Sequence, residues 1–179
     1  MRVETNRNGG PAVAVVAAML FLIATGTAFA QDGDFKEVEQ DGFTLRWRVS
    51  GDNVEVEVEA ETSGWIAVGF DPSRRMKDAN MIIGYVAGGE ASVSDQFGTS
   101  ATGHKKDVDI GGSNDLLESD VTESNGRTRL RFVIPLDSGD DADQPLTPGS
   151  EHTVLLAAGG SDDFTTYHGG TRTVVRITL

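Results

Sequence analysis

Two side chains with donor atoms suited to haem iron lie far apart in this sequence. Met76 carries a thioether sulfur and His168 an imidazole. Each falls in a short polar break between apolar, strand-like runs, where a β-fold can bring loops from distant parts of a chain together. If both bind iron from opposite sides, no position stays open for O₂ or a substrate. The pair therefore predicts a non-covalent haem b site that passes single electrons, in an electron carrier rather than an enzyme.

Both ligands have alternatives that the residues alone leave open. Methionine often merely fills space, and a lone histidine in a turn is commonly structural or exposed. His104 lies in a long loop and is the alternative histidine ligand, whereas His152 begins an apolar run and looks like a surface residue. Lys77 is a weaker rival of Met76, because an amine with a pKa of about 10.4 must lose its proton before it binds iron.

A haem pocket also needs apolar walls and a few cations near the two propionates. We take the candidates from their proximity to Met76 and His168 in the sequence. The expected cations are Arg74, Arg75 and Lys105. The expected walls are aromatic residues and one methionine: Trp65, Phe70, Met81, Tyr85, Phe97, Phe164 and Tyr167.

Other metal and cofactor sites are poorly supported. The chain has no cysteine, which excludes covalent haem attachment through Cys-x-x-Cys-His, zinc–thiolate sites and iron–sulfur sites. The acidic run at 137–143 offers oxygen ligands that suit Ca²⁺, but it lacks the spacing and the terminal glutamate of an EF-hand loop. We therefore expect that run to be a solvated turn.

The elements that must position the ligands are strands. Apolar and polar residues alternate with a period of two, as in Phe43, Leu45 and Trp47, which is typical of half-buried strands. Two long loops, 97–117 and 137–151, are where function tends to lie. No helical period follows the first thirty residues, so the fold class is all-β, an antiparallel immunoglobulin-like β-sandwich. The predicted strands are 43–49 and 54–59, which form a hairpin, then 65–70, 81–86, 91–96, 127–134, 153–158 and 173–179.

One predicted strand is strongly basic on one face. Arg127, Arg129 and Arg131 alternate with Thr128, Leu130 and Phe132 there. An acidic row at 55–59 lies on another predicted strand, and opposite charges across neighbouring strands stabilise each other. We therefore expect cross-strand ion pairs at this face, with no ligand involved.

Residues 1–30 have the pattern of a secretory signal peptide. Two arginines precede an apolar stretch at 11–24, and Ala-Phe-Ala at 28–30 provides a small-x-small cleavage site. The apolar stretch is shorter than the ~20 residues that a transmembrane helix needs. We expect cleavage after residue 30, a single β-sandwich domain over 31–179, no membrane anchor after cleavage, and a periplasmic or secreted protein.

The formal net charge of −13 limits the partners of the protein. Nucleic acids and anionic membrane surfaces carry negative charge themselves, so both are disfavoured. The charge is better explained as a means of keeping an exported protein soluble.

Segments 64–71 and 76–85 together resemble the first core motif of the DOMON domain family, in which the early methionine is the haem ligand. Met76 occupies that position here, and segment 161–168 is similar to a later part of bacterial secreted members. The likeness extends over nearly all of 31–179. Domains of this family are β-sandwich modules related to the cytochrome domain of cellobiose dehydrogenase and to the N-terminal domain of dopamine β-monooxygenase.

The resemblance implies a β-sandwich with haem b held by Met76 and His168. It also implies an unidentified redox partner, such as a membrane cytochrome or a dehydrogenase. Some members of the wider family bind sugars or have lost haem. The alternative function is therefore a haem-free secreted module that binds a carbohydrate or a protein.

Overall fold

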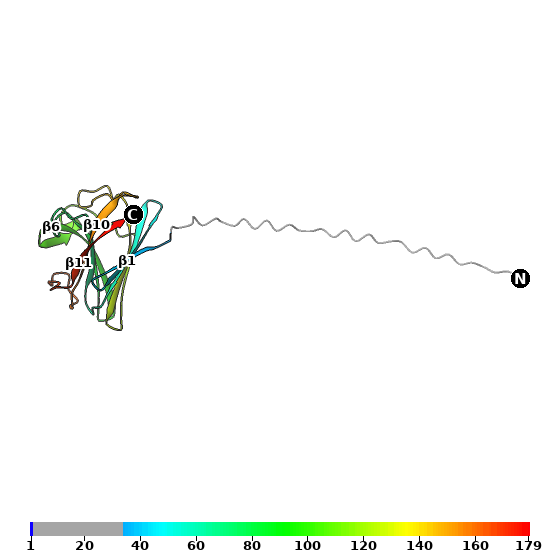
Figure 1. Cartoon of the computed structure of the whole chain (residues 1–179), viewed down its shortest axis with the longest axis horizontal. Coiled ribbons are helices and arrows are strands. Elements are labelled where there is room, and N and C mark those ends of the chain that lie inside the picture. The colour runs from blue at the N-terminus through cyan, green and yellow to red at the C-terminus, as the bar shows by residue number, and fades with distance from the viewer. Residues whose placement is uncertain (2–33) are drawn as a thin grey trace. The chain divides into compact units, whose positions relative to one another are not determined.

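The computed structural model describes Met1 and residues 34–179. The predicted signal peptide, Met1 apart, lies outside the described residues, and so does the boundary between residues 30 and 31. Both stay predictions. Figure 1 shows the described domain, coloured by residue number from its first strand to its last.

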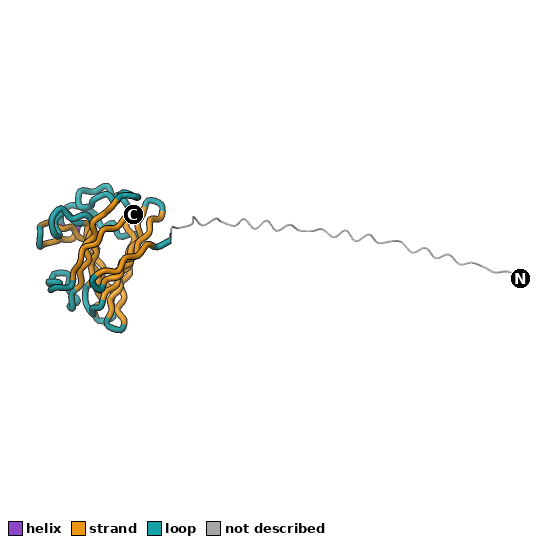
Figure 2. Tube along the Cα trace, in the orientation of Figure 1, coloured by secondary structure: helices purple, strands orange, loops and turns teal. Residues whose placement is uncertain are grey.

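Residues 34–179 form two antiparallel sheets, and strands and loops make up this part of the chain in Figure 2. The smaller sheet has the order β1-β2-β3-β9-β8, and the larger one β11-β10-β4-β5-β6-β7. The prediction of an all-β sandwich is confirmed. The strands are β1 (Lys36–Gln40), β2 (Phe43–Ser50), β3 (Asn53–Ala60), β4 (Ile66–Phe70), β5 (Asn80–Ala87), β6 (Glu90–Ser100), β7 (Gly103–Lys106), β8 (Glu118–Ser124), β9 (Arg127–Pro135), β10 (Glu151–Ala158) and β11 (Arg172–Thr178), and a short 3₁₀ turn, η1 (Asp107–Asp109), follows β7.

The hairpin predicted at the start of the domain is present. Phe43 of β2 pairs with Ala60 of β3, and Ser50 pairs with Asn53, which leaves a two-residue turn. Gly51 in this turn has φ +59°, a left-handed conformation that glycine adopts without steric cost. Every second side chain of β2 is buried from Phe43 to Trp47, as the alternation predicts.

The main core lies between the two sheets. Phe70 of β4 packs edge-on against Phe132 of β9, with ring centroids 6.5 Å apart. A side chain at Gly84 of β5 would meet Leu130 and Val121 of the opposite sheet. Even-numbered residues of β4 and β5 therefore face the interior of the sandwich, and odd-numbered residues face away from it.

The expected ion pairs on the basic strand are confirmed. Glu59 of β3 lies opposite Arg129 of β9 in the register, with Oε2 2.7 Å from the Arg129 Nη2 atom. Arg127 also pairs with Glu59, at 2.5 Å, and Arg131 with Glu55, at 2.6 Å. This row covers the face of the smaller sheet that does not contact the core, and it needs no ligand.

Among the residues that the structure describes, no helix is long and apolar enough to cross a membrane.

Candidate functional site

A second apolar cluster lies on the face of the larger sheet that points away from the sandwich core. All five residues of β4 are buried, including those that face outward. Strand β4 lies between β10 and β5, so Ala67 is flanked by Ala157 and by Ile83. We call this the outer-face cluster. It consists of Trp65, Ala67, Ala79, Met81 and Ile83, with Met76, Tyr85, Leu155, Ala157 and Phe164 packed against them.

Met76 reaches the outer-face cluster from the loop between β4 and β5. The loop is a tight turn, because Ala79 N donates to Met76 O at 3.1 Å and Ser73 N donates to Lys77 O at 2.9 Å. It also lies against Gly98 at the far end of β6. Asp78 N donates to Gly98 O at 2.7 Å, and Gly98 N donates to Ala79 O at 2.9 Å.

Gly98 is required for that close approach. A Cβ atom at residue 98 would overlap the Met76 carbonyl oxygen and lie 2.7 Å from its carbonyl carbon. Only glycine lets the backbone of the Met76 loop come this near to β6. The placement of Met76 therefore depends on a residue far from it in the sequence.

His168 lies in the loop between β10 and β11 and is half-buried. Its ring is edge-on to Trp65 with centroids 6.5 Å apart, and it stacks at a tilt on Tyr167 at 4.4 Å. The Nδ1 atom lies 3.0 Å from Gly169 O, to which Nδ1–H donates in the matching tautomer. In that tautomer Nε2 keeps its lone pair, which is the usual arrangement of a metal-binding histidine.

Burial lowers the pKa of His168 from its usual value, and the nearby Arg172 lowers it further. A lowered pKa favours the neutral imidazole, the form that binds a metal. The sequence reasoning did not single out Arg172. Its Nη1 donates to the Tyr167 hydroxyl at 3.2 Å and to Gly169 O at 3.2 Å. It is therefore a cation beside the histidine, whereas Arg74, Arg75 and Lys105 are exposed residues on other segments.

Trp65 links the His168 loop to the outer-face cluster. It is 6% exposed, and its Nε1 atom is buried without a hydrogen-bond partner among the described residues. A side chain at Gly159 would overlap this indole, which explains the glycine there. An indole N–H usually finds an acceptor when it is buried, so this donor suits a polar group of a bound ligand.

The predicted wall residues fall into two groups. Trp65, Met81, Tyr85 and Phe164 all belong to the outer-face cluster, with the rings of Tyr85 and Phe164 4.6 Å apart. The exposed Tyr167 contacts His168 from the solvent side.

The prediction that Phe70 and Phe97 line the same site is wrong. Phe70 is fully buried between the sheets. Phe97 pairs with Asn80, an even-numbered residue of β5, and therefore faces the opposite side of the sheet from Met81. The error arose because nearness in sequence does not specify the face on which a strand residue lies.

The two other histidines also differ from expectation. His104 is on strand β7 rather than in a loop, with Nδ1 2.5 Å from Gln96 Oε1. Gln96 of β6 pairs with Met81, so its side chain lies on the outer face of the sheet. His104 contacts it from β7, the edge strand of this sheet. His152 is buried rather than exposed, with Nδ1 2.6 Å from Asp71 Oδ2 and Nε2 3.1 Å from Thr147 O. It ties β10 to the end of β4.

The acidic run at 137–143 is only partly the solvated turn that we expected. Asp137 and Asp141 are exposed, but Asp143 is 9% exposed. It lies near Asp95 and Asp107, two buried carboxylates from other segments. Sequence spacing could not reveal this group, because its members come from three separate parts of the chain.

Comparison with known proteins identifies the family of this chain. The family model of the DOMON domain matches residues 39–159, more than half of the chain. The chain belongs to the DOMON domain family. The match starts in β1 and ends just after β10, so it includes Met76 and five of the six strands of the larger sheet. His168 and β11 lie beyond its end.

Curated relatives of this DOMON domain are much longer proteins. "MOXD1 homolog 2" of Drosophila melanogaster is 30% identical over 100 residues, which cover 56% of this chain and 13% of the relative. "DBH-like monooxygenase protein 1" of Homo sapiens is 24% identical over 112 residues, which cover 63% of this chain and 18% of the relative. The matched part thus spans less than a fifth of either relative.

Two solved structures share the fold. The cytochrome b domain of pyranose dehydrogenase from Coprinopsis cinerea superposes with a TM-score of 0.52 at 14% identity, covering 80% of each chain. The cytochrome domain of Myriococcum thermophilum cellobiose dehydrogenase also gives 0.52, at 11% identity and 81% coverage of each chain. At these identities the likeness shows the fold alone.

Proposed function

We propose that this DOMON domain is an exported electron carrier that binds one haem b on the outer face of its larger sheet, with Met76 and His168 as axial ligands. The observation that carries the proposal is the convergence of the two residues on one apolar cluster. Met76 packs against the cluster directly, and His168 contacts its Trp65. They approach from loops at opposite ends of β4.

The residues present fit the chemical needs of haem. The macrocycle needs apolar walls, which the outer-face cluster offers. The iron needs two donors, and the sulfur of Met76 and the Nε2 atom of His168 are of the right types. The propionates need cations and N–H donors, for which Arg172 and the unpartnered Nε1 of Trp65 are suitable.

When bound, haem iron with two protein ligands supplies reversible one-electron chemistry. The residues of this chain would determine the orientation of the histidine ligand, the access of water and the reduction potential. In the tautomer with the proton on Nδ1, His168 would donate to Gly169 O, and this bond would fix the orientation of the ring. Burial among apolar side chains would limit the access of water to the haem, and the thioether of Met76 would favour the reduced iron and raise the potential.

A haem-free binding module is the second candidate, and one observation favours it. The outer-face cluster is closely packed by the chain itself, with Met81 at 6% and Ile83 at 2% exposure. On this view Met76 and Phe164 are a hydrophobic cover, and the neighbouring loops bind a carbohydrate or a protein partner.

Titration with haemin separates the two candidates. The purified protein should bind one equivalent, become red, and give a low-spin b-type spectrum that is reversibly reduced by dithionite and reoxidised. A protein that remains colourless with excess haemin would contradict the proposal and favour the binding module. A high-spin spectrum would contradict ligation by both residues.

We also propose that the protein is exported and exchanges electrons with an unidentified partner, such as a membrane cytochrome or a dehydrogenase. The support is the signal-peptide pattern of residues 1–30 together with membership of the DOMON family. The intact mass of the exported protein should correspond to an N-terminus at Gln31. A chain that keeps residues 1–30 in the membrane fraction would contradict export by cleavage.

A further inference from the structure

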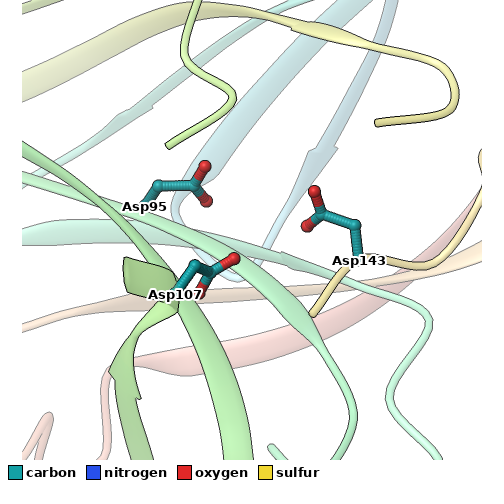
Figure 3. Close-up of side chains that lie close together, drawn as sticks. All are labelled: Asp95, Asp107 and Asp143. Atoms are coloured by element: carbon teal, nitrogen blue, oxygen red, sulfur yellow. The ribbon is translucent and has the colours of Figure 1, made fainter. Parts of the chain in front are cut away.

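A group of buried carboxylates lies on the other side of the larger sheet from the outer-face cluster. Asp95 is on β6, Asp107 in η1, and Asp143 in the loop between β9 and β10. Asp95 pairs with Ile82, a core residue, and thus faces away from the outer-face cluster. Figure 3 shows the three carboxylates directed toward a common space between their segments. One oxygen from each lies within 4.8 Å of the other two.

The carboxylates are deeply buried, and four of their six oxygens have no partner among the described residues. Asp107 is 1% exposed, Asp95 5% and Asp143 9%. Both oxygens of Asp107, and Oδ1 of Asp95 and of Asp143, have no hydrogen-bond partner among the described residues. Within residues 34–179, no ion pair joins a lysine or arginine to any of the three. Buried polar groups are normally satisfied, so four orphan oxygens in one place suit a bound cation.

The burial of these carboxylates and their repulsion also change their pKa values. Burial, followed by the nearby carboxylates, raises the pKa of Asp107 to about 8. Burial also raises the pKa of Asp143 to about 7 and that of Asp95 to about 6. Three carboxylates held this close resist ionisation together, and a bound dication would relieve both their desolvation and their repulsion.

Neighbouring residues hold the group in place. Asp115 N donates to Asp95 Oδ2 at 2.8 Å, which leaves Oδ1 of Asp95 directed into the site. Ser113 Oγ donates to Asp140 Oδ2 at 2.8 Å and lies 3.0 Å from Asp115 Oδ1. Asp115 and Asp140 also form a second group with Asp143. The loop after η1 and the loop after β9 are thus already tied together around Asp143.

We propose that Asp95, Asp107 and Asp143 bind one Ca²⁺ ion, which fastens η1 and the loop between β9 and β10 to strand β6. Ca²⁺ takes oxygen ligands at about 2.3–2.6 Å in flexible geometry, so two ligand oxygens on opposite sides lie up to about 5 Å apart. The ligand oxygens of the three carboxylates, one from each, lie within 4.8 Å of one another, which is close enough for one Ca²⁺ ion to contact all three. A site with only carboxylate oxygens disfavours zinc and copper, which prefer nitrogen and sulfur ligands.

The test compares two charge-neutralising variants of the purified protein. Asp107→Asn removes a proposed ligand, whereas Asp141→Asn is a matched control, because Asp141 lies in the same acidic run and is exposed. Each protein is stripped with EDTA and dialysed, then titrated with CaCl₂ by calorimetry and melted with and without Ca²⁺. The wild type and Asp141→Asn should bind one Ca²⁺ with a Kd below about 1 mM and melt at a higher temperature in its presence.

Asp107→Asn should bind Ca²⁺ at least tenfold more weakly. In EDTA it should be at least as stable as the wild type, because an amide cannot ionise among the neighbouring carboxylates. This result would exclude misfolding as the reason for lost binding. The proposal is overturned if millimolar Ca²⁺ neither binds to the wild type nor raises its melting temperature. It is also overturned if Asp107→Asn binds Ca²⁺ as tightly as the wild type, or if Asp141→Asn loses binding to the same extent as Asp107→Asn. An equal response to Mg²⁺ would overturn the assignment to Ca²⁺.

Discussion

Replacing Gly98 with alanine should displace the Met76 loop. The new Cβ would overlap the Met76 carbonyl oxygen, which belongs to backbone and cannot rotate away as a side chain can. The loop must move, and two backbone hydrogen bonds, Asp78 N to Gly98 O and Gly98 N to Ala79 O, are then weakened or lost. Overpacking typically costs about 1–3 kcal/mol. Each lost bond adds about 0.5–1.5 kcal/mol, so the free energy of unfolding should fall by about 2–6 kcal/mol.

The assay is urea unfolding followed by circular dichroism, with Gly160→Ala as the matched control. A Cβ at Gly160 meets nothing within 4 Å, so this variant should stay within about 0.5 kcal/mol of the wild type. If haem is bound, Gly98→Ala should also lose low-spin character, because Met76 is moved from the iron. Equal stability of the two variants would refute the close packing of the Met76 loop on β6.

Three further predictions concern the core and the charged groups. Leu130→Ala, at a fully buried position between the sheets, should lower the free energy of unfolding by about 2–5 kcal/mol in urea; a loss below 1 kcal/mol would contradict the described core. The pKa of Glu59 is lowered chiefly by its hydrogen bond with Arg129. The stabilisation from this ion pair is therefore present above the pKa of the unfolded state and is lost as pH falls through the pKa of the folded state. Glu59→Gln should thus make the free energy of unfolding less dependent on pH on the acid side. In EDTA, the raised pKa values of Asp107 and Asp143 mean that the folded state holds more protons than the unfolded state. The free energy of unfolding should therefore fall as pH rises from about 4 to about 8. A free energy of unfolding that does not change over this range would show that these carboxylates are not buried together.

The sequence predicted the strands that contribute most to the core and missed three that contribute little to it. β1, β7 and β8 each lie at an edge of a sheet. Their residues are mostly exposed, and Val121 is the one buried side chain among the three strands. Edge strands pair on one side and can be polar on both faces, so they have little hydrophobic alternation to detect.

The candidate site was predicted in part. Met76 and His168 could be named because their donor atoms are uncommon and lie in polar breaks between apolar runs. Phe70 was misplaced because β4 is buried on both faces, and a strand without polar residues gives no sign of which face points where. The group of Asp95, Asp107 and Asp143 could not be found by spacing, because the fold alone brings these three segments together.

The measurement that tests the central claim most directly is the absorption spectrum of haem-loaded His168→Ala beside that of His104→Ala. The two histidines are alternatives for one ligand position, and each lies outside the main core. His168→Ala should largely lose haem, because a weak thioether alone remains. His104→Ala should keep the low-spin spectrum of the wild type. If His104→Ala loses haem while His168→Ala retains it, the site on the outer face between Met76 and His168 is contradicted.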